Sequence, residues 1–324
     1  MVDHCRTALD KLRRAQNFAR KENEIAYLLE LENRSLDDPM TETIPDKRLE
    51  MIFTCCHPAL ERKSQVALTL RTLGGLSTDE IAAAFLDKPS SMQKRITRAK
   101  QQIARGAIPY KVPQGADMPE RISAVLSVLY LIFNEGYSAN SGTAVLRSDL
   151  SVEAIRLTRI IAALLPNDCE AAGLLALMLL HDSRRNARVG PAGEMIALED
   201  QNRKRWDREE IQEGVAILKE KLPKQGIGPY QIQAAISAVH AQSPAWDQTD
   251  WTEIVALYEL LHAMQPSPVV QVNLAVAVSY AQTPEAALMI MEKVATATKI
   301  QTYQPYHAAM GNLLARDAGL QRLR

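Results

Sequence analysis

The sequence has few cysteines and no long apolar run, and both absences narrow the class of protein. Only 4 cysteines occur in 324 residues, and two of them, Cys55 and Cys56, are adjacent. Adjacent cysteines suit neither a disulfide framework nor a zinc site, whose paired ligands are spaced apart. The longest apolar run, residues 122–133, is shorter than the roughly 20 residues that span a bilayer. Charged residues follow Met1 at once, so we expect no secretory signal, no membrane partner and a cytoplasmic location.

The sequence also lacks the usual signatures of catalysis. It has no glycine-rich phosphate loop, no G-x-S-x-G motif and no spacing of paired carboxylates or metal ligands that rises above chance. His57 follows Cys55 and Cys56, which raises the interpretation of a thiolate–imidazole pair. Consecutive residues of a helix do not share a face, however, and buried cysteine is usually inert, so core packing is favoured. We therefore expect no enzyme, no catalytic residue, no metal and no cofactor.

Two short helical patterns between residues 76 and 103 carry the main functional signal. The first begins with Ser77 and Glu80, which have the spacing of a capping box. The second begins at Pro89, whose fixed φ suits the first turn of a helix. Its apolar residues fall on one stripe, which comprises Met92, Ile96, Ala99 and Ile103. Such a pair predicts a helix-turn-helix, in which the second helix lies in the major groove of DNA.

The other face of this second helix is polar and basic. In a helix-turn-helix the N-terminal residues of the second helix meet base edges, and basic side chains further along contact phosphates. The candidate DNA-binding residues are Ser90, Ser91, Gln93, Lys94, Arg95, Arg98 and Lys100. The alternative interpretation is an ordinary amphipathic helix pair with a solvated basic face, which a short pattern alone does not exclude.

Charge placement favours the DNA-binding interpretation. Between Arg62 and Lys111 there are ten basic residues and three acidic ones, a net charge of +7, whereas the whole chain has a formal net charge of 0. A neutral protein that concentrates positive charge on one short segment has the electrostatic character of a phosphate-binding module.

Several stretches together resemble region 4 of bacterial RNA polymerase sigma factors, within the extracytoplasmic-function group of the sigma-70 family. They are residues 49–60, residues 66–71 with Gly74, Gly75 and Leu76, and the helix-turn-helix itself. The chain is similar, more narrowly, to the class with a long helical, TPR-like C-terminal extension. That similarity rests on residues 107–110, 130–138, 177–182 and 198–201.

This resemblance implies a transcription initiation factor. Region 4 would read the −35 promoter element and contact the β-flap of the RNA polymerase core, and the extension would modulate activity. The start of the chain, at residues 8–14, resembles only the last helix of region 2, so the −10 function is in doubt. Two alternatives stay open: a TPR-like interaction scaffold that no longer reads promoters, and a one-component DNA-binding regulator without sigma activity.

The patterns predict an all-α protein in which a helix-turn-helix domain precedes a helical-repeat domain. We assign residues 1–45 to the remnant of region 2 plus a linker, 46–110 to region 4 and 119–324 to the repeats. Helices are expected at residues 120–135, 152–165, 169–183, 208–222, 230–242, 251–264, 269–281, 285–298 and 306–318, with prolines and glycines as breakers. The pair Asn273-Leu274 recurs 39 residues later as Asn312-Leu313, as in a loose helical repeat. The repeats present a surface that is expected to dock on region 4 or on polymerase.

Two further segments have open interpretations. One is a cluster of charged side chains that comprises His181, Asp182, Arg184, Arg185 and Arg188. It forms either an anion-binding pocket or, as we favour, a solvated helix end with cations near its C-terminus. Residues 194–207 interrupt the helical rhythm and are either a partner or ligand site or a hairpin folded against its own repeat.

Overall fold

The computed structural model describes residues 47–85, 87–113, 115–137, 148–191, 193–221, 227–295, 300 and 303–323. Within these ranges the regular structure is helical, and the sole extended pairing is an isolated bridge between Val189 and Met195. The expected all-α class is thereby confirmed. The assigned region 2 remnant and its linker, residues 1–45, lie outside the described residues.

The chain forms two compact units, one ending at Leu164 and the other beginning at Leu165. This division falls later in the chain than the expected boundary between residues 110 and 119. The first helix after that boundary contacts helices that precede it, and the second helix contacts the first. The assigned ranges 46–110 and 119–324 stay predictions, since compactness does not show which segments fold independently.

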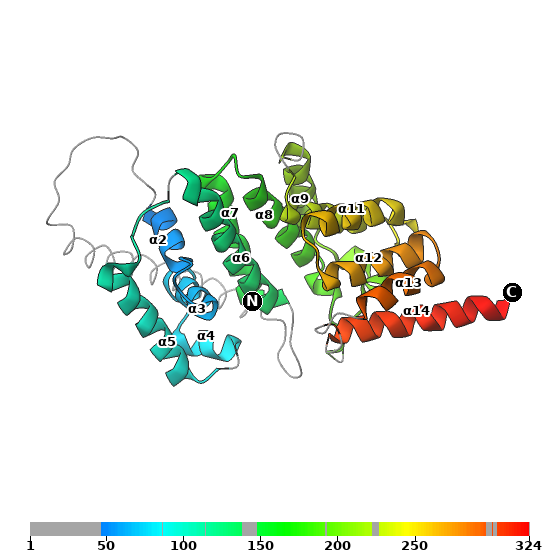
Figure 1. Cartoon of the computed structure of the whole chain (residues 1–324), viewed down its shortest axis with the longest axis horizontal. Helices are drawn as coiled ribbons and strands as arrows, with labels where there is room; N and C mark the ends of the chain where they lie inside the picture. Colours follow the sequence, from blue (N-terminus) through cyan, green and yellow to red (C-terminus); the bar gives the residue numbers. More distant parts are fainter. Residues whose placement is uncertain are drawn as a thin grey trace, which may run out of the picture. The chain divides into compact units, whose positions relative to one another are not determined.

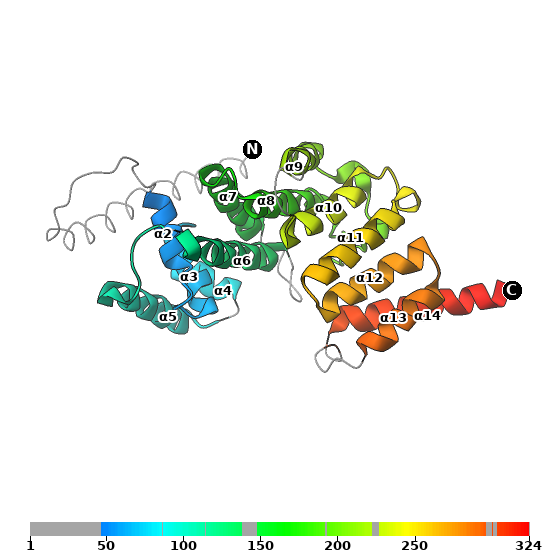
Figure 2. The same cartoon turned by 45° about the horizontal axis from the view of Figure 1, so that its top comes forward.

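Unit 1 contains the helix-turn-helix and two longer helices. Its elements are α2 (Lys47–Cys55), α3 (Arg62–Thr72), α4 (Thr78–Ala84), α5 (Pro89–Gln102), a π-helical turn (Ile103–Ala107), a 3-10 turn (Gly115–Asp117), α6 (Met118–Tyr137) and α7 (Ser148–Leu164). Helix α3 contacts α4 and α5 on one side and α6 on another, as Figures 1 and 2 show. Helix α5 and the pair α6–α7 thus lie on different sides of α3.

The core of this unit follows from the apolar pattern of its helices. Ile52 and Phe53 of α2, Leu68 and Leu70 of α3, and Ile81 of α4 are fully buried. Each fully buried side chain of this size stabilises the fold by about 1.5–3 kcal/mol relative to an exposed one. The buried Ile81 belongs to the short helix α4, which contacts both α3 and α5.

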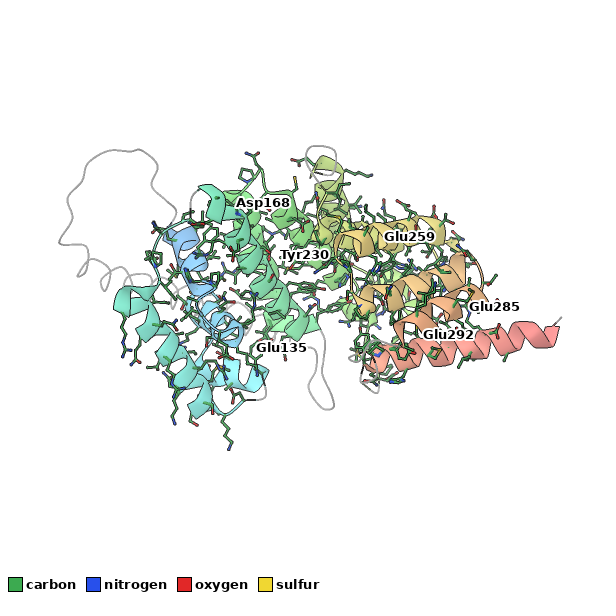
Figure 3. All side chains as sticks on the ribbon, viewed as in Figure 1. Glu135, Asp168, Tyr230, Glu259, Glu285 and Glu292 are labelled. Atoms are coloured by element: carbon green, nitrogen blue, oxygen red, sulfur yellow. The ribbon has the colours of Figure 1, made fainter. Side chains whose placement is uncertain are left out.

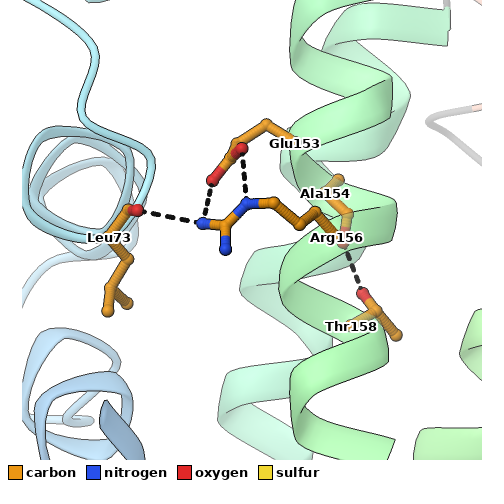
Figure 4. Close-up of polar contacts among 5 residues, drawn as sticks. All are labelled: Leu73, Glu153, Ala154, Arg156 and Thr158. Carbon is orange, nitrogen blue, oxygen red and sulfur yellow. Dashed lines mark hydrogen bonds and ion pairs between the residues drawn. The ribbon is translucent and has the colours of Figure 1, made fainter. Parts of the chain in front are cut away.

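Arginine side chains connect α6 and α7 to α2 and α3. Arg121 at the start of α6 donates to the carbonyl oxygen of Phe53, at 2.6 Å, and Arg62 of α3 donates to the carbonyl oxygen of Ala124. Figure 4 shows a third contact, in which Arg156 of α7 donates to the carbonyl oxygen of Leu73 at 3.1 Å. These contacts make α6 and α7 a support for α2 and α3.

Unit 2 is an array of helices in which neighbours in the chain contact one another. Its elements are α8 (Cys169–Asp182), α9 (Arg208–Lys221), α10 (Pro229–Gln242), α11 (Trp251–Met264), α12 (Pro268–Ala281), α13 (Pro284–Val294) and α14 (Gln304–Leu323). Contacts link α8 to α9 and α10, and then run in order from α10 to α14. Short 3-10 turns lie at Arg185–Ala187, Leu198–Asp200, Arg203–Arg205 and Trp246–Gln248.

Three prolines that we expected to separate helices are instead their first residues. Pro229, Pro268 and Pro284 begin α10, α12 and α13. The correction has a simple reason: the first turn of a helix does not use its N–H groups internally, and the fixed φ of proline is already helical. Ser267 and Thr283 precede two of these prolines and cap the helices with their hydroxyl groups.

Helices α8 and α10 lie unusually close together at their N-terminal ends, where Figure 3 labels Asp168 and Tyr230. The Glu170 carboxylate accepts hydrogen bonds from the backbone N–H groups of Tyr230 and Gln231, at 3.0 and 3.1 Å. A Cβ at Gly173 would lie 2.8 Å from the backbone nitrogen of Gln231, so this approach requires glycine. Among the helices that the structure describes, none has the length and apolar character needed to cross a membrane.

Candidate nucleic-acid interface

The start of α4 has the capping box expected from the sequence. The Glu80 carboxylate accepts from the backbone N–H of Ser77 at 2.6 Å, and the Ser77 hydroxyl accepts from the backbone N–H of Glu80 at 3.1 Å. Pro89 is the first residue of α5, also as expected. These features fix where each of the two helices begins.

Helix α5 buries one apolar stripe and exposes its polar face. Met92, Ile96 and Ala99 are each 3% exposed. Ile103, expected on the same stripe, is only half-buried, because α5 ends at Gln102 and the chain continues in a π-helical turn. Gly106 then turns the chain away from the helix with a φ of 72°, a conformation that favours glycine.

The structure exposes most of the candidate DNA-binding residues. The exposed ones are Ser90, Ser91, Gln93, Lys94, Arg98 and Lys100. Lys88, which precedes the first residue of α5, has no side-chain hydrogen bond across the helix start. The N-terminal end of α5 therefore combines two exposed hydroxyl groups with the positive end of a helix dipole, which favours anionic groups.

Arg95 differs from the other candidates. Its guanidinium lies 3.2 Å from the Glu61 carboxylate and 3.6 Å from that of Asp87, and its side chain is 23% exposed. Glu61 and Asp87 come from the start of α3 and from the turn before α5. Arg95 therefore connects α5 to the start of α3 and to the turn before α5.

Gln93 is positioned by two threonines. The Thr78 hydroxyl of α4 donates to the Gln93 side-chain oxygen at 3.1 Å, and the Gln93 amide donates to the Thr97 hydroxyl at 3.2 Å. This chain of hydrogen bonds joins the two helices across their exposed side. It orients an amide that has both donors and an acceptor, which is the kind of group that reads adenine in the major groove.

The sequence interpretation missed two exposed residues of α5. Thr97 and Gln101 are exposed and lie opposite the buried stripe, on the same side as Lys94 and Arg98. At 100° per residue, a helical wheel centred on Ile96 places both positions on the outward face, so the signal was present in the sequence. The emphasis on basic residues hid these polar ones.

The adjacent cysteines form no reactive pair with His57. Both thiols are buried, and burial raises the pKa of Cys56 to about 12 and that of Cys55 still further. The Cys56 sulfur lies 3.6 Å from the Thr69 hydroxyl. The Nδ1 atom of His57 accepts from the backbone N–H of Ala59 in the turn after α2. Core packing, the favoured interpretation, fits these contacts.

The basic cluster after His181 is divided between two environments in unit 2. His181 is linked through Nε2 to the Ser237 hydroxyl at 3.0 Å, and burial keeps its pKa well below the usual value. Arg185 instead pairs with the buried Asp182 carboxylate at 2.8 Å and approaches Glu210 at 3.6 Å. Burial, and then the nearby Asp182, raise the pKa of Glu210 to about 7. Arg185 therefore faces two carboxylates, whereas Arg184 and Arg188 are close enough to His181 to lower its pKa, and the anion-binding interpretation stays a prediction.

Residues 194–207 fold against their own helical unit. Arg203 donates to the carbonyl oxygen of Ser243 at 2.8 Å and lies over the ring of Trp206, which is 3% exposed. Glu199, in contrast, is exposed, and its carboxylate accepts from the Tyr280 hydroxyl at 3.1 Å. Most of the segment thus fits the hairpin interpretation, while Glu199 extends to a different part of the array.

Comparison with known proteins supports the region 4 assignment. Residues 50–103 match the family model described as Sigma-70, region 4. Helices α2 to α5 therefore form a sigma-70 region 4 helix-turn-helix domain. It is followed by a helical domain, and residues 121–222 match a family of unknown function, DUF6596.

The chain also has a relative over most of its length. It is 46% identical over 269 residues to an uncharacterized protein of Rhizobium meliloti (strain 1021), an alignment that covers 83% of this chain and 63% of that protein. The chain therefore spans less than two thirds of the length of that relative. No solved structure matches the chain. The narrower resemblances, to the extracytoplasmic-function group and to a TPR-like extension, stay predictions.

Proposed function

We propose that this protein is a sigma-type transcription initiation factor that acts in the cytoplasm. Its region 4 reads the −35 promoter element and contacts the β-flap of core RNA polymerase, and its helical domain modulates that activity. The observation that carries the proposal is the exposed polar and basic face of α5, on a helix whose opposite stripe is buried, within a segment that matches sigma-70 region 4.

The residues divide by the kind of DNA contact that each is suited to make. Ser90, Ser91 and Gln93 lie toward the N-terminal part of α5, where a recognition helix meets base edges. Lys94, Arg98 and Lys100 are exposed cations suited to phosphates, and Arg95 joins them once it leaves Glu61 and Asp87. Thr97 and Gln101 add polar groups on the same outward face.

The pair α6–α7 supports region 4 without covering its reading face. Arg121 and Arg156 bind the carbonyl oxygens of Phe53 and Leu73, which belong to α2 and the end of α3, and α5 lies on another side of α3. This part of the helical domain therefore orients region 4 and does not compete with DNA.

The test is binding of the chain to a duplex that carries a −35 element and to a scrambled duplex, by fluorescence anisotropy at several salt concentrations. We expect tighter binding to the −35 duplex and affinity that falls steeply with salt, by a slope of about −0.9 per neutralised phosphate. Arg205→Gln, a change at an exposed cation of unit 2, serves as the control variant. Equal affinity for both duplexes would contradict promoter reading.

Binding to an isolated β-flap fragment, and promoter-dependent transcription with core polymerase, separate the alternatives. A scaffold or a one-component regulator supports no initiation, and a regulator binds its duplex without binding the flap. A chain that binds the −35 duplex but not the flap would therefore favour the regulator over the sigma factor.

A further inference from the structure

A pocket in unit 2 belongs to none of the residues assigned to DNA or polymerase. It has a volume of about 190 Å³ and lies between residues 197–199, the 3-10 turn at Trp246–Gln248, α12 and α14. Leu198, Val276 and Leu313 give it mainly apolar walls. A cavity of about 150 Å³ accepts a molecule as small as benzene, so this pocket suits a small molecule and not a folded partner.

One carboxylate marks the polar side of this pocket. Glu199 lines it and is exposed, and its Oε2 atom accepts from the Tyr280 hydroxyl at 3.1 Å. Burial, followed by the nearby Glu199, raises the pKa of Tyr280, so the hydroxyl keeps its proton and remains a donor to Glu199. This hydrogen bond orients the carboxylate, whose other oxygen can accept from a bound group.

Aromatic rings form the neighbouring wall. Trp246 lines the pocket and meets the ring of Tyr280 edge to face at 5.2 Å, and Trp251 stacks on Tyr280 at 4.4 Å. Two of the 3 tryptophans of the chain, Trp246 and Trp251, meet at this half-buried cluster. One face of Trp246 stacks on His240 at 5.8 Å. A tryptophan ring beside a carboxylate is a common setting for organic cations, since the ring face is negative.

The cluster already holds one cation of the protein itself. The guanidinium carbon of Arg316 lies 4.1 Å from the centroid of Tyr280. Both terminal nitrogens of Arg316 donate to Ser279, one to its hydroxyl at 2.8 Å and the other to its carbonyl oxygen at 3.0 Å. Arg316 is therefore fixed on Tyr280, whereas Glu199 and Trp246 line the pocket.

The segment that carries Glu199 is held in place before any ligand binds. Gln201 donates to the carbonyl oxygen of Ile196, which closes the turn around Glu199, and Arg203 fixes the following turn to the end of α10. A preorganised carboxylate binds more tightly than a mobile one, because less conformational entropy is lost on binding.

We propose that this pocket binds a small organic cation. Its ammonium or guanidinium group lies between the Glu199 carboxylate and the Trp246 ring, and its apolar part packs against Leu198, Val276 and Leu313. The site is separate from the DNA contacts of the proposed function, because none of its residues belongs to unit 1.

The test uses the whole chain and n-butylammonium chloride as the probe, with tryptophan fluorescence as the readout. We expect a saturable change with n-butylammonium and none with butan-1-ol, which has the same chain without the charge, or with sodium chloride. Glu199→Gln should lower the affinity at least about tenfold, since it removes the charge and keeps a group that can accept from Tyr280. Asp200→Asn, a change at the adjacent exposed carboxylate, should leave the affinity unchanged.

A second variant tests the aromatic wall by calorimetry, which does not depend on the fluorescence of the residue removed. Trp246→Leu should weaken binding of n-butylammonium about threefold or more, within the range of a cation–π contact. Absence of saturable binding, an equal response to butan-1-ol, or equal losses in Glu199→Gln and Asp200→Asn would each overturn the proposal.

Discussion

The guanidinium of Arg156 and the carbonyl oxygen of Leu73 are hydrogen-bonded at 3.1 Å although the two residues are 83 positions apart in the chain. Arg156 also holds both oxygens of Glu153, at 2.9 and 2.7 Å. Leu73 directly follows the last residue of α3, where free carbonyl groups attract a cation. One arginine of α7 therefore stabilises the end of a region 4 helix and compensates a buried carboxylate.

Replacing Arg156 by Met should destabilise unit 1. Glu153 is only 4% exposed, so the change leaves a buried charge without its guanidinium and should lower the free energy of unfolding by about 3 kcal/mol. Urea unfolding measures the change, with Arg105→Met, at an exposed position, as the control. A loss much smaller in a Glu153→Gln background would confirm that the buried charge is the cause, and equal losses in both backgrounds would refute it.

Neutralising Glu61 should strengthen DNA binding. Glu61→Gln removes one of the two carboxylates that hold Arg95 and also removes a negative charge near the reading face. We expect a several-fold higher affinity and a salt slope steeper by about 1, as one more cation reaches a phosphate. Anisotropy titrations measure both, with Glu209→Gln in unit 2 as the control. An unchanged slope would mean that Arg95 does not contact phosphate.

Gln93 and Arg98 should differ in the kind of binding energy they contribute. Gln93→Ala should cost about 1–3 kcal/mol on the specific duplex and relax specificity at one base pair. Arg98→Ala should weaken binding to specific and scrambled duplexes alike and flatten the salt slope. Titrations on both duplexes compare them, and a uniform loss from both substitutions would remove Gln93 from the base-reading residues.

Unit 2 should lose stability as the pH falls from 6.5 toward 4. Burial, and then Arg184 and Arg203, lower the pKa of His240 to about 4, so the folded state favours the neutral ring. His240 makes its full contribution to the free energy of unfolding above the unfolded pKa of 6.5. This contribution is lost as the pH falls through the folded pKa of about 4. Urea unfolding of His240→Phe, which keeps a ring to stack on Trp246, should show a weaker dependence over this range.

Glu210 should act in the opposite sense and so provides an internal check. The pKa of Glu210 is raised to about 7 in the folded protein. Glu210 therefore makes its full contribution to the free energy of unfolding below the unfolded pKa of 4.5, and this contribution is lost as the pH rises to about 7. Glu210→Gln should remove this decline. If His240→Phe and Glu210→Gln changed the pH dependence in the same direction, the assignment of both groups would be wrong.

Local features of the fold were predictable from the sequence. The capping box at Ser77 and Glu80, the start of α5 at Pro89 and the bounds of α11, which match the expected residues 251–264, depend on neighbouring residues alone. The three prolines at the start of α10, α12 and α13 were assigned to the wrong side of the helix boundary. A proline marks such a boundary without showing on which side it lies.

Contacts between distant residues were not predictable. Arg95 was expected to be as accessible as Lys94, but Glu61, 34 residues earlier, lies against it. The sequence likewise gave no sign that Glu199 meets Tyr280, 81 residues later, or that α6 and α7 support α2 and α3. Such pairs depend on how helices pack, and periodicity determines only which face of each helix is buried.

The chain-order contacts of unit 2 have a consequence for how it opens. Because α10 to α14 each contact the next helix, the terminal helix can separate without breaking the contact between α8 and α10. Amide protons of α14 should therefore exchange with solvent much faster than those of α8, where the side chains from Ala171 to Leu180 are buried. Protection should increase from the C-terminal end of the array toward α8, in steps that correspond to single helices.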